Sequence, residues 1–64
     1  MSKSRAAIRT VKILELVAEY PNGLTMSEIA NELDIPVTSV NDIIKSLVEM
    51  EMLDLIDTRS KTYG

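Results

Sequence analysis

The segment from residue 26 to residue 47, MSEIANELDIPVTSVNDIIKSL, has the spacing of two short helices that cross at a tight turn. Ala30 is small enough to let a second helix approach closely, and Asp34 stands where the backbone must reverse. An aspartate adopts the left-handed conformation that such a turn needs at less cost than a branched residue. The pattern predicts a helix-turn-helix motif, whose second helix normally enters the DNA major groove.

Apolar periodicity and turn residues divide the chain into three helices and a hairpin. Thr25 and Glu28 have the spacing of a capping box, Leu24 before them can pair as a strand of one or two residues, and Pro36 suits the first turn of a helix. We expect one domain, residues 1–64, mainly α with a small β-hairpin, which is a winged helix-turn-helix built as a three-helix bundle plus wing. The expected elements are helices over about 4–20, 26–33 and 36–50 and a wing over about 52–63.

The residue inventory argues against several classes of function. The chain has no cysteine and no histidine, and therefore no disulfide, zinc-finger ligand, thiol nucleophile or usual general base near neutral pH. No stretch approaches the roughly 18 apolar residues of a membrane span, and no signal peptide is visible. We expect a cytoplasmic protein that is not an enzyme, has no membrane partner and uses no cofactor and no metal.

The charges are unevenly distributed along a chain whose net charge is −3. A net acidic chain argues against a nucleic-acid partner, because neutralisation of phosphates supplies much of the affinity for DNA. If the basic ends flank the second helix of the motif in space, however, the domain has a basic face despite its acidic total. The alternative is that these cations only solubilise the chain ends. All ten acids and Lys45 lie in residues 13–57, and the other cations are Lys3, Arg5, Arg9, Lys12, Arg59 and Lys61.

The third predicted helix turns a polar face away from the core. On this face Asn41 can bond adenine edges, and Lys45 can bond a guanine or a phosphate. Thr38 and Ser39 can reach phosphate oxygens near the start of the helix. Asp42 either accepts from a cytosine amino group or pairs with Lys45, and the pairing is favoured because direct readout by aspartate is the rarer contact.

Two further sets of residues are candidates for contact with partners. Arg5 and Arg9 in the first helix, with Arg59 and Lys61 near the tip of the wing, are expected to anchor phosphates. For Arg59 or Lys61 taken alone, a charged turn that contacts no partner is nearly as good an interpretation as a phosphate anchor. The first helix has an apolar arc too wide for one neighbour, which predicts either packing against several core elements or a dimer interface. The dimer candidates are Ile8, Ile13, Leu16 and Tyr20.

Several short matches, in order and in spacing, make the chain similar to a known family. They are Ser4-Arg5-Ala6, Leu14-Glu15-Leu16, a Pro-x-Gly-Leu-Thr turn, Glu28-Ile29-Ala30, Leu33, Ile35-Pro36 and Ser39-Val40. Over nearly its whole length the chain resembles the N-terminal winged helix-turn-helix domain of IclR-type bacterial and archaeal transcriptional regulators. The resemblance implies binding of operator DNA as a homodimer, with the third helix as reader and the first helix in the subunit contact. It also implies a separate effector-sensing domain, which these residues lack, so we expect an excised fragment or a stand-alone relative.

Three positions depart from the pattern of that family. Val37 stands where a basic residue is usual, Asp42 where an arginine is common, and Glu51 where a glycine is expected. Two lost cations and one gained anion remove phosphate contacts. We therefore expect DNA binding with a steep salt dependence and a need for two half-sites about one helical turn apart.

The sequence favours a sequence-specific domain for double-stranded DNA from a bacterial or archaeal transcriptional regulator. One alternative is a protein-interaction winged helix, in which the acidic face around Asp42 and Glu49 meets a basic partner. Another is a purely structural dimerisation domain, which would form dimers that ignore DNA.

Overall fold

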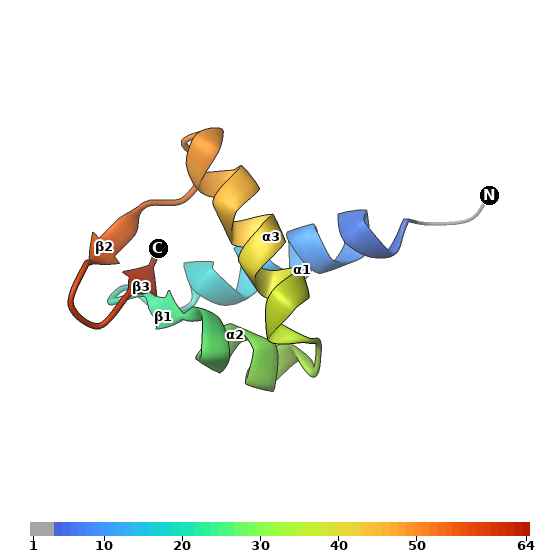
Figure 1. The fold of residues 1–64 in the computed structure, drawn as a ribbon, viewed down its shortest axis with the longest axis horizontal. Helices are drawn as coiled ribbons and strands as arrows, with labels where there is room; N and C mark the ends of the chain where they lie inside the picture. The colour runs from blue at the N-terminus through green and yellow to red at the C-terminus, as the bar shows by residue number, and fades with distance from the viewer. Residues whose placement is uncertain (1–3) are drawn as a thin grey trace.

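The computed structural model describes residues 4–64, in which three helices pack beside a small sheet (Figure 1). Lys3, one of the N-terminal cations, lies outside the described residues. The helices are α1 (Arg5–Ala18), α2 (Met26–Leu33) and α3 (Val37–Glu49), and the strands are β1 (Leu24–Thr25), β2 (Leu55–Asp57) and β3 (Thr62–Tyr63). This is the winged helix-turn-helix that the sequence predicts, mostly helical with a small antiparallel sheet.

The first helix starts at a capped residue and ends two residues earlier than the sequence pattern suggests. The Ser4 hydroxyl accepts a hydrogen bond from the backbone of Ala7 at 3.4 Å and so caps the helix start. At the other end the amide of Tyr20 bonds to the Val17 carbonyl, a tighter turn than an α-helix makes. Gly23, at a φ of 82°, then reverses the chain toward β1.

The second helix begins with the predicted capping box. The Thr25 hydroxyl accepts from the Glu28 backbone at 3.1 Å, and the Glu28 carboxylate accepts from the Thr25 backbone at 2.9 Å. Two amides that the first turn leaves without partners are thereby satisfied. The box holds the start of α2 directly against β1, which ends at Thr25.

The turn between α2 and α3 has the left-handed residue that the sequence predicts. Asp34 has φ 54° and ψ 50°, and the next amide, of Ile35, bonds to the Ala30 carbonyl at 3.1 Å. This is the bonding of a Schellman motif, which usually uses glycine. Pro36 is the N-cap residue of α3 and has an extended backbone, with ψ 139°. It therefore lies one residue before the first turn of the helix, whereas the sequence pattern places it within that turn.

The last strand in the chain occupies the middle of the sheet. β3 pairs antiparallel with both β1 and β2, in the order β1-β3-β2. Tyr63 lies opposite Leu24 on one side and Leu55 on the other, and the register shifts by a bulge between Leu55 and Asp57. The wing is therefore a hairpin whose returning strand is also joined to the chain before α2.

The core is aliphatic, as a chain with two tyrosines and no other aromatic residue requires. Ile13 is 0% exposed, which corrects the expectation that it meets a second subunit: its whole side chain is used inside the domain. The alternative of packing among several core elements holds for this residue. The buried apolar residues are Ile13, Val17, Leu24, Ile29, Val40, Ile44, Leu47 and Leu53.

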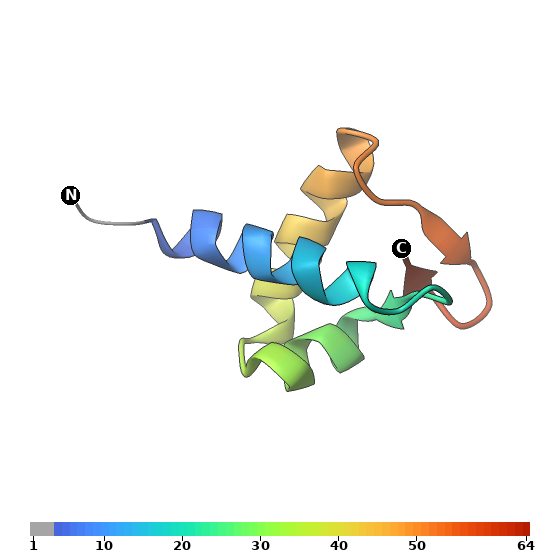
Figure 2. The same ribbon diagram turned by 180° about the vertical axis from the view of Figure 1, so that it is seen from behind.

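The arrangement of the helices separates the two basic segments. α1 crosses behind α3 in Figure 1 and in front of it in Figure 2, with its N-terminal end at one side of the molecule and the wing at the other. α3 lies between them along the longest axis, whose extent is 41 Å. Within residues 4–64, none of the helices has the length and hydrophobicity that crossing a membrane requires.

Candidate nucleic-acid interface

The outer face of α3 is polar and largely free of the rest of the domain. Val40, Ile44 and Leu47 face the core, so the side chains on the opposite side of the helix point outward. Thr38, Asp42, Lys45 and Glu49 are exposed, whereas Ser39 and Asn41 are half-buried at the two edges of this face. Three of the five α3 candidates, Thr38, Asp42 and Lys45, are therefore fully exposed on this face, with Asn41 at one margin and Ser39 at the margin nearest α1.

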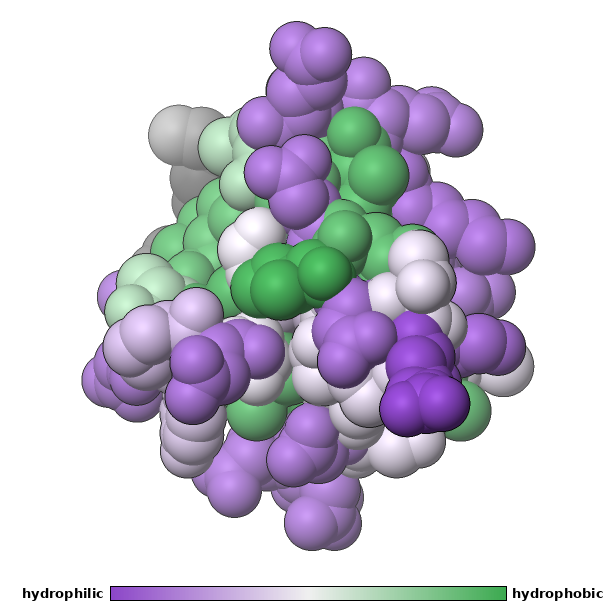
Figure 3. Space-filling view, turned by 90° about the vertical axis from the view of Figure 1, so that its left-hand side faces the viewer, coloured by the Kyte–Doolittle hydropathy of each residue, from purple (hydrophilic) through white to green (hydrophobic). Residues whose placement is uncertain are grey.

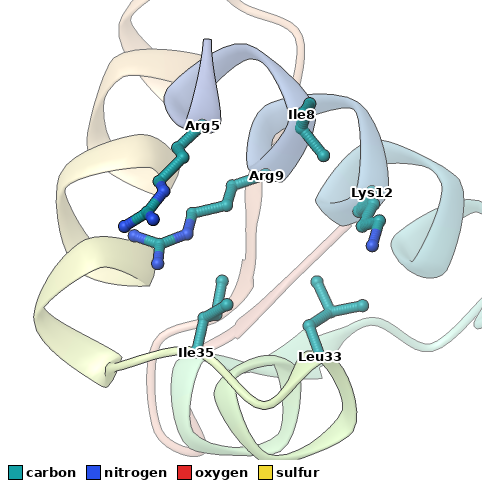
Figure 4. Close-up of a pocket in the computed structure, with 6 residues that line it drawn as sticks. All are labelled: Arg5, Ile8, Arg9, Lys12, Leu33 and Ile35. Atoms are coloured by element: carbon teal, nitrogen blue, oxygen red, sulfur yellow. The ribbon is translucent and has the colours of Figure 1, made fainter. Parts of the chain in front are cut away.

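A hydrogen bond joins the basic part of α1 to the start of α3. Nη1 of Arg9 donates to the Ser39 hydroxyl at 3.1 Å. Arg5 extends beside Arg9 toward the same first turns of α3, as Figure 4 shows. Two of the predicted phosphate anchors are therefore grouped with the N-terminal turn of the helix that is expected to read bases. Ser39 itself is engaged inside the domain, which the sequence did not indicate.

An acid at the end of β2 is hydrogen-bonded to the wing turn that follows it. The Asp57 carboxylate accepts a hydrogen bond from the Arg59 backbone at 2.9 Å. This bond, followed by one from the Ser60 side chain, lowers the pKa of Asp57 from the ordinary aspartate value. Arg59 and Lys61 are both exposed on the turn, and Lys61 has a positive φ of 57°. The two cations therefore project from a turn whose backbone is hydrogen-bonded to the side chain of Asp57.

The turn of the wing also meets the start of α2. Lys61 and Ser60 line a hollow of about 430 Å³ together with Thr25, Ser27 and neighbouring side chains. The first amides of a helix and nearby hydroxyls are good donors to an anion, especially beside a lysine. Sequence reasoning singled out Lys61 but missed Ser27, because only the sheet order brings the wing turn to this helix end.

The rest of the wing has a different surface. Apolar side chains gather in the middle of the face at the wing side of the molecule, and hydrophilic ones surround them (Figure 3). Leu55 and Ile56 in β2 are 41% and 51% exposed, and Met52 before them is 55% exposed. An apolar strand face has no donors for phosphate, so the turn that bears Arg59 and Lys61 is the part of the wing suited to a polyanion.

The remaining α1 candidates differ in exposure. Ile8 and Tyr20 are 37% and 40% exposed, while Leu16 is half-buried and packs against the core. Val11 is 55% exposed beside Ile8. An apolar strip on the outside of α1 therefore consists of Ile8 and Val11, with Ser4, Ala7, Lys12 and Glu15 around it.

Among residues 4–64, no group of three or more acidic side chains is arranged to hold a metal ion.

Residues 6–55 match the family described as the IclR helix-turn-helix domain. Comparisons with curated proteins and with solved structures find no match.

Proposed function

Because the chain belongs to the IclR helix-turn-helix family and carries a DNA-binding domain of transcription regulators, we propose that it reads a specific sequence in double-stranded DNA with α3 in the major groove. The observation that carries this proposal is the position of α3, which lies between the basic start of α1 and the wing with a polar face outward. The proposed source is a bacterial or archaeal transcriptional regulator.

Bases are contacted by the middle of the α3 face. Asn41 and Lys45 have side chains that hydrogen-bond to base edges, adenine for the amide and guanine for the ammonium. Thr38, one turn earlier, is exposed and meets a phosphate. Asp42 accepts from a cytosine amino group or pairs with Lys45, and in either case it reduces the attraction of this helix for phosphates.

Phosphates are contacted on both sides of α3. Arg5 and Arg9 anchor one strand beside the first turn of α3, where Ser39 is already bonded to Arg9. Arg59 and Lys61 anchor the backbone at the wing, and Lys61 does so with the start of α2. Few contacts of this kind leave a single domain with a low affinity, and two half-sites about one helical turn apart then supply the rest. Because the salt slope grows with each phosphate that is neutralised, two domains bound together depend more steeply on salt than one.

Two half-sites require two copies, and the outer strip of α1 suits a homodimer contact. Ile8 and Val11 form its apolar centre. Arg5 lies in the first turn of α1, whereas Glu15 lies in its C-terminal half, so two antiparallel α1 helices place opposite charges next to each other. Tyr20 is exposed beyond the C-terminal end of α1 and joins the same contact.

An electrophoretic shift of a random duplex at several salt concentrations tests the DNA contact. We expect retardation at low ionic strength, and weaker retardation with a salt slope lower by about one for Lys45→Ala or Arg59→Ala. Lys45→Arg and Arg59→Lys are the matched controls, since each keeps the positive charge at the same position and should keep the salt slope. Absence of retardation at low salt, or a salt slope that the two alanine variants leave unchanged, would contradict the proposal.

A second candidate function rests on the acids of α3. Asp42 and Glu49 are exposed on the same face as Lys45, and a winged helix of this kind can bind a basic protein instead of DNA. In that case the wild-type chain does not retard DNA at low salt, and Asp42→Asn abolishes binding of the protein partner. A purely structural dimerisation domain would instead sediment as a stable dimer with or without DNA.

A further inference from the structure

A groove runs between the first turns of α1 and the turn that joins α2 to α3 (Figure 4). Its volume is about 250 Å³, just below the roughly 300–1,000 Å³ of most small-molecule sites. Ligands much smaller than a drug molecule fit such a space. The groove is lined by Arg5, Ile8, Arg9, Lys12, Leu33 and Ile35.

The charge in this groove is opposite to that of the chain. Arg5, Arg9 and Lys12 contribute three cations, and no acid is among the six lining residues, although the net charge of the chain is −3. Their spacing of four and three residues places the three cations along one side of α1, where like charges repel. Within residues 4–64, the side chain of Arg9 hydrogen-bonds to the neutral hydroxyl of Ser39. A bound anion would relieve this repulsion.

The opposite wall of the groove is apolar. Leu33 at the end of α2 and Ile35 in the turn point up toward α1, and Ile8 faces them from above (Figure 4). Leu33 and Ile35 are half-buried, so part of their apolar surface is still in contact with water. A DNA phosphate would use the cations of the groove but would leave this wall uncovered. A ligand with both a charge and a hydrocarbon part uses both.

We propose that this groove binds a small organic carboxylate that carries a hydrocarbon tail. The carboxylate lies between the guanidinium groups of Arg5 and Arg9, which can bond it through paired N–H donors. The tail lies along Ile8, Leu33 and Ile35, where each buried methylene adds to the affinity. Lys12, at the other end of the groove, attracts the anion by its charge.

Binding at this site has a consequence for DNA, and that consequence alone rests on the function proposed above. Arg5 and Arg9 are also the proposed phosphate anchors beside α3, so one group of cations serves both ligands. A carboxylate bound in the groove competes with the DNA backbone for these cations. The domain would then respond to an organic acid directly, through the same residues that hold the operator.

The test is a titration of the 64-residue chain with sodium octanoate, hexanoate, acetate and octan-1-ol at pH 7, without DNA, followed by backbone amide NMR shifts. We expect shifts confined to the start of α1 and to the turn around Ile35, with an affinity order of octanoate, hexanoate, acetate. Each methylene that reaches the apolar wall should raise affinity by up to about fourfold. Octan-1-ol, which lacks the charge, should bind more weakly than octanoate.

Three variants separate the charge from the apolar wall. Arg5→Ala, which removes the exposed one of the two partners of the carboxylate, should weaken octanoate binding about threefold, the effect of one exposed charge pair. Ile8→Ser should flatten the dependence on tail length. Glu15→Gln, one turn further along α1 and outside the groove, should leave the affinity within about twofold of the original. Equal binding of octanol and octanoate, an unchanged affinity for Arg5→Ala, or shifts elsewhere in the domain would overturn the proposal. Because DNA is absent, these results are independent of whether the chain binds an operator.

Discussion

Arg9 in α1 and Ser39 in α3 are thirty residues apart in the chain and are joined by a hydrogen bond of 3.1 Å from the guanidinium to the hydroxyl oxygen. The bond links α1 directly to the first turn of the proposed reading helix. A hydrogen bond from a charged donor stabilises a fold by about 1.5–3 kcal/mol. The contribution is smaller where water competes for the donor, as it does at this partly buried pair.

The first prediction concerns this bond. Arg9→Ala and Ser39→Ala should each lower the free energy of unfolding by about 1 kcal/mol, and the double variant should lose less than the sum of the two. Chemical denaturation of the three variants measures the coupling. Arg5→Ala combined with Ser39→Ala is the matched control and should be additive. Additive losses for the Arg9 and Ser39 pair would show that the bond contributes nothing to stability.

The second prediction concerns the end of α3. The amide of Glu51 bonds to the Val48 carbonyl at 3.0 Å and that of Met52 to the Leu47 carbonyl at 2.9 Å, while Glu51 has a positive φ of 60°. This motif favours glycine at the left-handed position, so Glu51→Gly should stabilise the domain by about 1 kcal/mol. Lys45→Gly, in the middle of the same helix, should destabilise it by about as much. Thermal unfolding distinguishes the two, and a loss of stability for Glu51→Gly would be inconsistent with this geometry.

The third prediction concerns Gly23 at the end of the turn after α1. A Cβ atom at this position would meet the Tyr63 carbonyl oxygen at 2.8 Å, and the residue has a φ of 82°. Gly23→Ala should therefore destabilise the domain by more than about 1 kcal/mol, because neither the backbone of β3 nor the left-handed conformation can adjust cheaply. A Cβ atom at Gly64 would crowd the flexible end of Ile56 and meet the Gly23 backbone only at an ordinary contact distance of 3.5 Å, so Gly64→Ala should cost less. Urea denaturation of both variants measures the difference, and equal losses would contradict the assignment.

The fourth prediction concerns Asp42 on the outer face of α3. Asp42→Asn keeps the shape of the side chain but removes a negative charge that faces the proposed DNA. The affinity for a random duplex at low salt, measured by its retardation, should increase about threefold, as expected for removal of one exposed repulsive charge. Glu19→Gln, which removes an equal charge at the far end of α1, is the control and should change the affinity little. Weaker retardation for Asp42→Asn would instead indicate a direct contact of the carboxylate with a cytosine amino group.

The fifth prediction concerns acid pH and the wing turn. The Arg59 amide, followed by the Ser60 side chain, lowers the pKa of Asp57 in the folded chain. Because the pKa is lowered in the folded chain, the ionised Asp57 carboxylate stabilises the fold. This stabilisation is complete above the ordinary aspartate pKa and is lost as the pH falls through the folded pKa. In an NMR titration the Asp57 carboxyl should titrate below an unstructured aspartate, and the Arg59 amide shift should follow it. Asp57→Asn keeps an acceptor oxygen and should remove this pH dependence, whereas titration at the ordinary value would exclude the bond.

Local signals in the sequence predicted the elements of this fold well. The capping box at Thr25 and the left-handed turn at Asp34 depend on residues within a few positions of each other, and both are present. The end of α1 was predicted less well, because Tyr20 continues the apolar pattern while its amide already belongs to a tighter turn. Propensity does not distinguish the last turn of a helix from such a turn.

Contacts between distant parts of the chain could not be predicted in the same way. Ile13 and Val11 lie on neighbouring parts of an apolar arc, and only the packing of α2 and α3 decides that Ile13 is buried and Val11 is exposed. Similarly, the Arg9 bond to Ser39 and the meeting of Lys61 with the start of α2 depend on how the elements cross. The roles of the α3 residues in DNA binding stay predictions, because exposure alone does not identify a contact.

The central place of β3 in the sheet has a consequence for how the chain acquires its shape during synthesis. β1 and β2 both precede β3 in the chain, yet each is paired with β3 and not with the other. On the ribosome, the helices can therefore collapse around their apolar residues while both strands still wait for Tyr63 to emerge. The wing assembles only after β3 has emerged, and a nascent chain that stalls before Tyr63 would expose two unpaired strands to aggregation.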